Sequence, residues 1–214
     1  MTLQEELDAM RQKAAGMDFF KVHENVSEDL RSSNKLANVP LVGETAPPFN
    51  LPDEADHLVS SGSLLEKGPL IISFFRGDWC AFCNLELRAL QRSLAEFQKF
   101  GASLVGISPQ TVSYSHMMAD RRNVQYQVLS DEGNKIANDY GLMFTMPEEL
   151  RNAYKTFGID IAQINNNPST AEVPVPATFV VNTDGLISYR FVDADYTKRA
   201  EPSEIIANLM TITK

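Results

Sequence analysis

Two cysteines stand three residues apart, at Cys80 and Cys83, and the chain of 214 residues has no others. The apolar run at residues 70–75 predicts a buried strand before them, and the residues after them have the spacing of an amphipathic helix. The dithiol is therefore expected at a strand-to-helix turn, where free backbone N–H groups and the helix dipole stabilise a thiolate. A second thiol three residues away can displace whatever the first has attacked and close a disulfide.

A Cys-x-x-Cys pair also occurs as half of a zinc site or as a structural disulfide. The three histidines, His23, His57 and His116, are scattered through the sequence without the spacing of metal ligands. A structural disulfide is rare in the cytoplasm, where close cysteines are more often catalytic. The sequence therefore favours redox chemistry that needs no metal, flavin or nucleotide within the chain.

The overall charge argues against several kinds of partner. The formal net charge is -9 and the pI is about 4.8, and no run rich in lysine and arginine supplies a surface for nucleic acid. The N-terminus is acidic where a secretory signal begins with a basic patch. No stretch approaches the roughly 18 apolar residues that cross a bilayer. We therefore expect a cytoplasmic protein that binds neither nucleic acid nor membrane.

Strand patterns alternate with helical patterns along the chain, which predicts an α/β sheet with crossover helices. The expected strands lie at residues 70–75, 102–107, 126–129, 177–181 and 186–191, the last two joined as a hairpin by the Asp184-Gly185 turn. The expected helices lie at residues 2–15, 27–37, 84–101, 112–122, 130–140 and 202–212, with a helix start at Pro147 and a loop at 165–169.

The composition changes at Gly43, where a proline-rich stretch keeps the chain extended and out of helix. This change predicts an N-terminal helical extension over residues 1–42 and one globular domain over residues 43–214. The helices of the extension are expected to pack on the domain or on a partner subunit.

A proline stands directly before the strand expected at residues 177–181. A cis peptide bond between Val175 and Pro176 would bring backbone close to the dithiol. Two trans prolines, at Pro174 and Pro176, would instead only keep an edge of the sheet extended. The residues alone leave both conformations open.

The motifs together resemble those of thioredoxin-fold proteins, and among them the peroxiredoxin-like branch of the alkyl hydroperoxide reductase and thiol-specific antioxidant (AhpC/TSA) family. Residues 79–83 resemble the thioredoxin Trp-Cys-x-x-Cys, and residues 175–179 resemble the cis-proline loop of that fold. Residues 43–51 resemble the opening of a peroxiredoxin domain. The resemblance covers residues 43–212 and implies a thioredoxin-like α/β fold with a central mixed β-sheet flanked by helices.

The two parent patterns disagree about the chemistry. Peroxiredoxins carry Pro-x-x-x-Thr-x-x-Cys and attack with the last cysteine, which aligns with Cys83. The proline position then holds Arg76, the threonine position holds Cys80, and the arginine that polarises the peroxide falls at about Pro176. Thioredoxins attack with the first cysteine, here Cys80, and their buried acid aligns with Phe74. The resemblance therefore leaves open which sulfur attacks first.

Arg76 is the third candidate catalytic residue, because a guanidinium near the dithiol stabilises a thiolate or donates hydrogen bonds to a peroxide oxygen. The alternative is a surface salt bridge with Asp78 or Glu86. Trp79 is expected to be a partly exposed platform beside the site. The residues expected to contact the substrate are Asp78, Trp79, Val175 and Pro176.

We therefore expect a thiol-dependent antioxidant oxidoreductase that reduces hydroperoxides through a disulfide cycle of Cys80 and Cys83, regenerated by a thioredoxin-like or other thiol reductant. In this cycle the Cys83 thiolate is expected to attack the peroxide and Cys80 to condense with the sulfenic acid. One alternative is thiol-disulfide exchange without efficient peroxidase activity, in which Cys80 attacks a disulfide substrate and Cys83 resolves the mixed disulfide. Another is a redox-sensing or binding module with little turnover, because a fold alone does not fix function. The resemblance also implies a homodimer, with the N-terminal helices as its expected interface.

Overall fold

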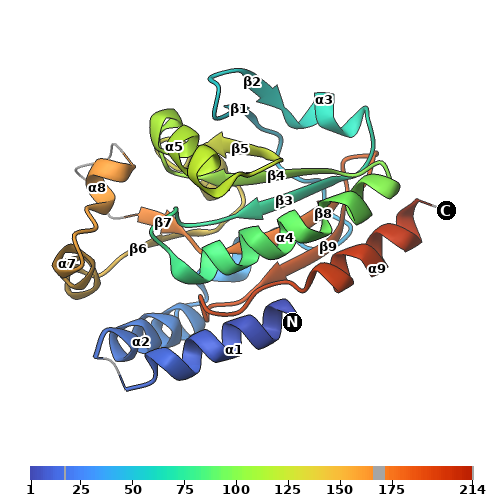
Figure 1. Cartoon of the computed structure of the whole chain (residues 1–214). Helices are drawn as coiled ribbons and strands as arrows, with labels where there is room; N and C mark the ends of the chain where they lie inside the picture. Colours follow the sequence, from blue (N-terminus) through green and yellow to red (C-terminus); the bar gives the residue numbers. More distant parts are fainter. Residues whose placement is uncertain (17, 166–171, 214) are drawn as a thin grey trace.

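The centre of the computed structural model, which describes residues 1–16, 18–165 and 172–213, is a five-stranded mixed sheet (Figure 1). Of residues 18 and 19 only the backbone is described. In spatial order the strands are β5 (Gln127–Ser130), β4 (Ser103–Ser108), β3 (Leu70–Phe74), β8 (Ala177–Val181) and β9 (Ile187–Val192). The first three run parallel to one another, and β8 is antiparallel to both β3 and β9. The prediction of a central mixed sheet is confirmed.

Helices cover both faces of this sheet. They are α1 (Leu3–Ala14), α2 (Asp18–Ser32), α3 (Ser61–Leu65), α4 (Ala81–Lys99), α5 (Val112–Arg122), α6 (Lys135–Asp139), α7 (Glu148–Thr156), α8 (Ile161–Ile164) and α9 (Pro202–Ile212), with a 3-10 turn η1 at Lys35–Asn38. Two small antiparallel pairs, β1 (Asn50–Pro52) with β2 (Leu58–Ser60) and β6 (Met143–Thr145) with β7 (Glu172–Pro174), lie outside the main sheet.

The alternation of side chains along β3 divides the core between the two faces. Ile71 packs in a cluster that also takes residues from α1, α4 and α9. Ile72, its neighbour, packs in a second cluster with residues of α3 and α6. Because both faces of β3 are covered, its continuous apolar sequence is the pattern that a central strand requires.

Most predicted elements appear within a few residues of their expected bounds, and α5 and α9 match them. The second helix is an exception, because it begins at Asp18 instead of Ser27. The Ser27 hydroxyl donates a hydrogen bond to the carbonyl of His23, one turn back at 3.0 Å. Serine makes this bond inside a helix, so Ser27 is an interior residue and the predicted cap is wrong. Of the loop predicted at residues 165–169, residue 165 caps the end of α8, and residues 166–169 lie outside the described residues.

The helix predicted from residue 130 is also shorter than expected. The Asp131 carboxylate does act at its start, since it accepts hydrogen bonds from the backbone N–H groups of Ile136 at 3.1 Å and Ala137 at 2.8 Å. A turn separates Asp131 from the first helical residue, Lys135, however. Asp131 therefore satisfies free N–H groups at the start of α6 although it precedes the helix by four residues in the sequence. Sequence spacing alone does not reveal this arrangement.

The Val175–Pro176 peptide bond is trans, because the described residues contain no cis peptide bond. The segment before it is an extended strand, β7, and the N–H of Val175 donates to the carbonyl of Leu142 at 2.7 Å. An extended chain that passes directly into β8 is compatible with the trans bond, which is intrinsically favoured by about 0.5–1 kcal/mol. Of the two conformations that the sequence left open, the chain therefore has the trans one, and the resemblance to a cis-proline loop does not extend to this peptide bond.

The helix α1 shares the core of the main sheet. Thr2 and Glu5 form a capping box at its start, and the side chains of Leu3 and Leu7 are buried in the cluster that contains α4. Figure 1 shows α1 and α2 lying together beside α4 and α9. The helices predicted at the N-terminus therefore pack on the rest of the fold, and the boundary at residue 43 stays a prediction.

We predict that Leu7→Ala lowers the free energy of unfolding by about 2–5 kcal/mol, because it removes a fully buried side chain and leaves a cavity between α1 and α4. The matched control is Gln12→Ala on the exposed side of the same helix, which should change the free energy by less than about 0.5 kcal/mol. Urea unfolding measures both. Equal midpoints for the two variants would show that α1 does not contribute to the core.

Candidate active site

The dithiol lies at the start of α4, directly beyond the loop that follows β3. Cys80 is the N-cap residue, and its Sγ accepts a hydrogen bond from the backbone N–H of Cys83 at 3.4 Å. Gly77 makes the turn possible, because it has φ of 142° and a Cβ there would lie 2.5 Å from the Trp79 ring nitrogen. Both cysteines are free thiols, and only 2% of Cys80 and 0% of Cys83 is exposed. The expected strand-to-helix placement is confirmed.

The guanidinium of Arg76 lies against the first sulfur. Its Nη2 donates a hydrogen bond to the Sγ of Cys80 at 3.2 Å, and the residue is only 1% exposed. The aromatic rings of Trp79 and Tyr196 contact the guanidinium at 5.1 and 4.4 Å from their centroids. These contacts hold a cation in a buried position beside the thiol.

The two carboxylates that the sequence offered as partners of this guanidinium pair with other arginines. Asp78 forms ion pairs with Arg121 and Arg122 at the end of α5. Glu86 is buried and forms an ion pair with Arg199, with Nε and Oε2 2.6 Å apart. The surface salt bridge considered as an alternative is therefore not formed in the described structure.

The two thiols have opposite tendencies to ionise. Burial raises the pKa of Cys80, but the hydrogen bond with Cys83 and the charges of Arg76 and Arg199 outweigh it and hold that pKa well below its usual range. Burial, together with the hydrogen bond and negative charge of Cys80, raises the pKa of Cys83 well above its usual range. The site therefore favours the thiolate form at Cys80 and the thiol form at Cys83.

A second arginine, Arg199, lies beside the second sulfur. Its Nη2 donates to the Sγ of Cys83 at 3.3 Å, and its Nε pairs with the Glu86 carboxylate. The hydroxyl of Thr178 on β8 donates to the other oxygen of Glu86 at 3.0 Å. Burial raises the pKa of Glu86 to about 7, although Arg199 and Thr178 act in the opposite direction. The second sulfur thus has a buried polar network of its own.

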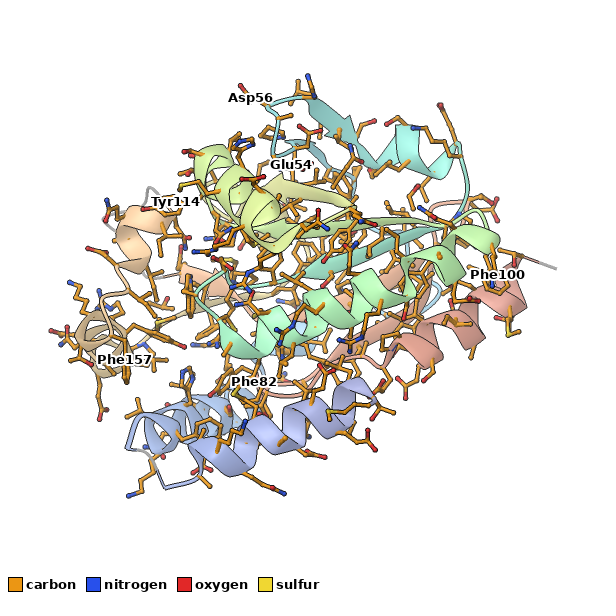
Figure 2. All side chains as sticks on the ribbon, in the orientation of Figure 1. Glu54, Asp56, Phe82, Phe100, Tyr114 and Phe157 are labelled. Atoms are coloured by element: carbon orange, nitrogen blue, oxygen red, sulfur yellow. The ribbon has the colours of Figure 1, made fainter. Side chains whose placement is uncertain are left out.

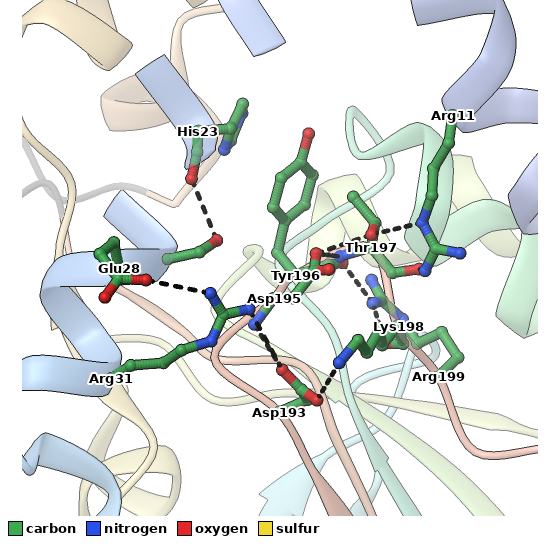
Figure 3. A network of polar contacts seen from close by, with 11 residues as sticks. Arg11, His23, Glu28, Arg31, Asp193, Asp195, Tyr196, Thr197, Lys198 and Arg199 are labelled. Carbon is green, nitrogen blue, oxygen red and sulfur yellow. Dashed lines mark hydrogen bonds and ion pairs between the residues drawn. The ribbon is translucent and has the colours of Figure 1, made fainter. Parts of the chain in front are cut away.

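The loop at residues 193–199 carries both Tyr196 and Arg199, and the N-terminal helices hold it in place (Figure 3). Arg11 of α1 donates to the Thr197 hydroxyl at 2.7 Å and to its carbonyl at 2.9 Å. Arg31 of α2 lies 4.0 Å from the carboxylate of Asp193. The position of the arginine beside Cys83 therefore depends on the first 32 residues of the chain.

The sequence reasoning missed Arg199 and Tyr196. Arg199 lies 116 residues beyond Cys83 and belongs to no motif or periodic pattern. Buried positions can be predicted from the periodic spacing of apolar residues in helices and strands. An arginine in a loop belongs to no such pattern, so the sequence does not predict that it is buried. Only the fold brings this residue to the dithiol.

The four residues predicted to contact the substrate differ in their exposure and in the part of the fold that they face. Trp79 is partly exposed and lies directly beside Arg76, as a platform would. Asp78 faces α5 and its two arginines. Val175 is buried in a cluster on which Trp79 packs, and Pro176 is buried next to it. Their contact with substrate stays a prediction.

A mixed sheet with a buried dithiol at the start of the helix after its central strand defines a thioredoxin-fold thiol protein. The sequence model of the AhpC/TSA family matches residues 42–190. The chain therefore belongs to this family.

Individual relatives agree with this assignment. The chain is 33% identical to peroxiredoxin Q, chloroplastic, from Sedum lineare over 54% of its own length and 61% of the relative. It is similarly 33% identical to the Arabidopsis thaliana protein of the same name over 47% of this chain and 46% of that one. The chain thus spans less than two thirds of the length of these curated relatives.

Solved structures show the same fold. Peroxidoxin BcpB from Mycobacterium tuberculosis superposes with a TM-score of 0.62 at 23% identity and covers 80% of this chain and 97% of that chain. The reduced 2-Cys peroxiredoxin of Plasmodium vivax superposes with a TM-score of 0.60 at 20% identity, over 81% and 82% of the two chains. The expected thioredoxin-like fold is confirmed.

None of the helices in the described residues is both long enough and apolar enough to cross a membrane. No group of three or more histidine, cysteine, aspartate and glutamate side chains in that part of the chain could hold a metal ion.

We predict that Arg76→Met raises the pKa of Cys80 by at least about one unit, because burial then acts with less opposing charge. At pH values below both midpoints, the rate of alkylation by iodoacetamide should fall about tenfold, because a rise of one pKa unit lowers the thiolate fraction by that factor there. The measurement is the pH dependence of that rate in a Cys83→Ser background, where Cys80 is the only thiol. Arg122→Met is the matched control and should leave the midpoint unchanged, since Arg122 pairs with Asp78. An unshifted midpoint in Arg76→Met would contradict the assigned role.

We also predict that Glu86 makes the stability of the reduced protein fall as the pH rises. A carboxyl whose pKa is raised on folding stabilises the folded state below its unfolded pKa, and this contribution is lost as the pH rises through about 7. Relative to Glu86→Gln, the wild type should lose at least about 1 kcal/mol of unfolding free energy between about pH 5 and pH 8. Urea unfolding at several pH values measures this, with the exposed Glu96→Gln on the same helix as the control. If Glu86→Gln follows the wild type across the range, Glu86 does not titrate there.

Proposed function

We propose that this protein is a thiol-dependent peroxidase that reduces hydroperoxides through a dithiol and disulfide cycle at Cys80 and Cys83. The observation that carries the proposal is a buried Cys80 thiol whose thiolate form is stabilised by Arg76, with a second thiol one helical turn away. Membership of the AhpC/TSA family and similarity to proteins named peroxiredoxin Q support it.

In the first half of the cycle, the Cys80 thiolate attacks the outer oxygen of the hydroperoxide. The S–O bond forms as the O–O bond breaks, and the leaving alkoxide takes a proton from solvent and departs as the alcohol. The sulfur is oxidised to a sulfenic acid and the peroxide is reduced. Arg76 stabilises the thiolate before attack and the negative charge that develops on the leaving oxygen.

In the second half, the sulfur of Cys83 attacks the sulfenic sulfur of Cys80. The S–S bond forms, and the hydroxyl group leaves with the proton of Cys83 as water. Arg199 lies 3.3 Å from the Cys83 sulfur and stabilises the negative charge on it as the proton leaves. An external dithiol of the thioredoxin type then reduces the disulfide, supplying two electrons and two protons.

The surroundings of the sulfurs favour Cys80 as the first nucleophile. Alignment with peroxiredoxins instead gives this role to Cys83, but that thiol is fully buried and its pKa is raised. The thiolate is the nucleophilic form of a cysteine, so the lower pKa supports Cys80.

Thiol-disulfide exchange is the second candidate, and the same observation favours it. The first cysteine of a Cys-x-x-Cys motif, with its pKa lowered at a helix N-terminus, is the nucleophile that attacks a disulfide substrate. Cys83 would then displace the substrate from the mixed disulfide. This candidate differs from peroxide reduction in substrate and uses the same two sulfurs.

We predict that Cys83→Ser still forms a sulfenic acid at Cys80 with hydrogen peroxide, whereas Cys80→Ser reacts at least about 100 times more slowly, because its remaining thiol is fully buried and burial itself raises the pKa of Cys83. Intact mass with a dimedone-type trap measures the sulfenic acid. The wild type serves as the control and should yield the intramolecular disulfide without trapping.

Other outcomes of this experiment assign the function differently. If Cys80→Ser reacts and Cys83→Ser does not, Cys83 attacks first, as the alignment predicts. If the wild type reacts with peroxide no faster than a free thiol of matched pKa but reduces a model disulfide, the exchange function replaces the peroxidase function. Reaction with neither would leave the redox-sensing alternative.

The thioredoxin-like reductant, the homodimer and the cytoplasmic location stay predictions. Light scattering with a variant that lacks α1 and α2 tests the homodimer and its expected interface. Turnover with a thioredoxin system tests the reductant.

A further inference from the structure

A largely apolar cavity of about 300 Å³ lies next to the dithiol, and the N-terminal helices form one of its walls. Arg76 and Trp79 line it on the side of the dithiol, and Met10, Ala14 and Phe20 line it from α1 and α2. Figure 2 shows Phe82, at the start of α4, facing these two helices. The wall that α1 and α2 form therefore comes from residues outside the region 42–190, which is the part of the chain that the family's sequence model matches.

Arg76 brings hydrogen-bond donors to this cavity. Its Nη2 is bonded to Cys80 and the guanidinium also interacts with Tyr154, but these two contacts do not use all the N–H groups of the buried Nε and Nη1. A buried donor without a partner costs about 1–3 kcal/mol, and more when it is charged. A ligand with an oxygen atom near the sulfur therefore gains by accepting hydrogen bonds from these two nitrogens.

The other residues that line the cavity determine which group on the ligand, besides its peroxide oxygens, can bind there. Phe20 contacts Phe82 and Tyr196, with ring centroids 6.1 and 6.3 Å apart, so aromatic rings surround the space. Hydrogen peroxide has no apolar surface to bury there. A compact aromatic group does, and its burial beside other rings is favourable. A volume of about 300 Å³ is at the lower end of small-molecule sites, which suits a compact body better than a long chain.

We propose that α1 and α2 make this cavity a selectivity site for hydroperoxides with a compact aromatic body, in preference to hydrogen peroxide. The inference rests on the proposed peroxidase function. The terminal peroxide oxygen lies beside the Cys80 thiolate and accepts a hydrogen bond from Arg76, and the ring lies beside Met10, Ala14 and Phe20. The bonds formed and broken are those of the peroxidase cycle, with the aromatic alcohol as the product.

The first test is the ratio of kcat/KM for cumene hydroperoxide to kcat/KM for hydrogen peroxide. We expect this ratio to be at least about ten in the wild type, and Ala14→Phe, which fills the cavity, to lower it at least about fivefold. Ala9→Phe is the matched control, because it makes the same change at an exposed position of α1 outside the cavity. It should leave the ratio within about twofold. A wild-type ratio near one, or an equal ratio in both variants, overturns the proposal.

The second test measures binding without turnover. Trp79 is the only tryptophan of the chain and lines the cavity, so its fluorescence reports on occupancy. Cumyl alcohol, the product of cumene hydroperoxide, should change this fluorescence in a saturable manner in the wild type and in Ala9→Phe. In Ala14→Phe, shown to be folded by circular dichroism, it should bind at least about tenfold more weakly. Absence of saturable binding to the wild type overturns the proposal.

The two tests separate failure of the inference from failure of the peroxidase function. If neither hydroperoxide is turned over, the peroxidase function is lost, and the fluorescence titration still decides whether the cavity binds an aromatic ligand. If both are turned over with equal efficiency, the peroxidase function holds and the selectivity proposed for α1 and α2 is wrong.

Discussion

The contact between the Arg76 guanidinium and the Cys80 sulfur is the interaction on which the site depends. A thiolate with only 2% exposure loses most of its hydration, so a buried positive charge has to compensate. Arg76 is itself only 1% exposed and is held by the rings of Trp79 and Tyr196. Each charge therefore makes the burial of the other tolerable, and removing one leaves the other uncompensated.

One turn further along α4, the second sulfur also has a buried cation beside it. There Arg199 lies between the Cys83 sulfur and the Glu86 carboxylate, again in a buried position. The two cysteines thus have separate cationic partners, one from the loop before α4 and one from the loop before α9. The unequal pKa values of the two thiols follow from this division and from the position of Cys80 at the N-cap. A Cys-x-x-Cys spacing alone would not distinguish the two sulfurs.

The sequence predicted the fold well where a short stretch of residues determines the local structure. The continuous apolar run of β3, the Asp184-Gly185 hairpin and the bounds of α9 all follow from local chemistry. Sequence failed where contacts across the fold decide. The start of α2 is one case. The bond before Pro176 is another kind of case, because the sequence left its conformation open and the fold has it trans. At the site, Cys80, Cys83 and Arg76 stand close together in sequence and could be found. Arg199 could not, since it meets Cys83 only through the topology of the sheet.

The separation between Cys83 and Arg199 also has a consequence for the order in which the protein is made. A chain grows at about 5–20 residues per second, so the 116 residues between them take roughly 6 to 23 s to synthesise. During that time both thiols have left the peptidyl transferase centre and Arg199 does not yet exist. Arg76 precedes both cysteines, but Tyr196, which holds its guanidinium, also arrives late. In a nascent chain the dithiol therefore lacks two of its partners through much of synthesis, and its two sulfurs become fully distinct only when the loop at residues 193–199 packs against α1 and α2.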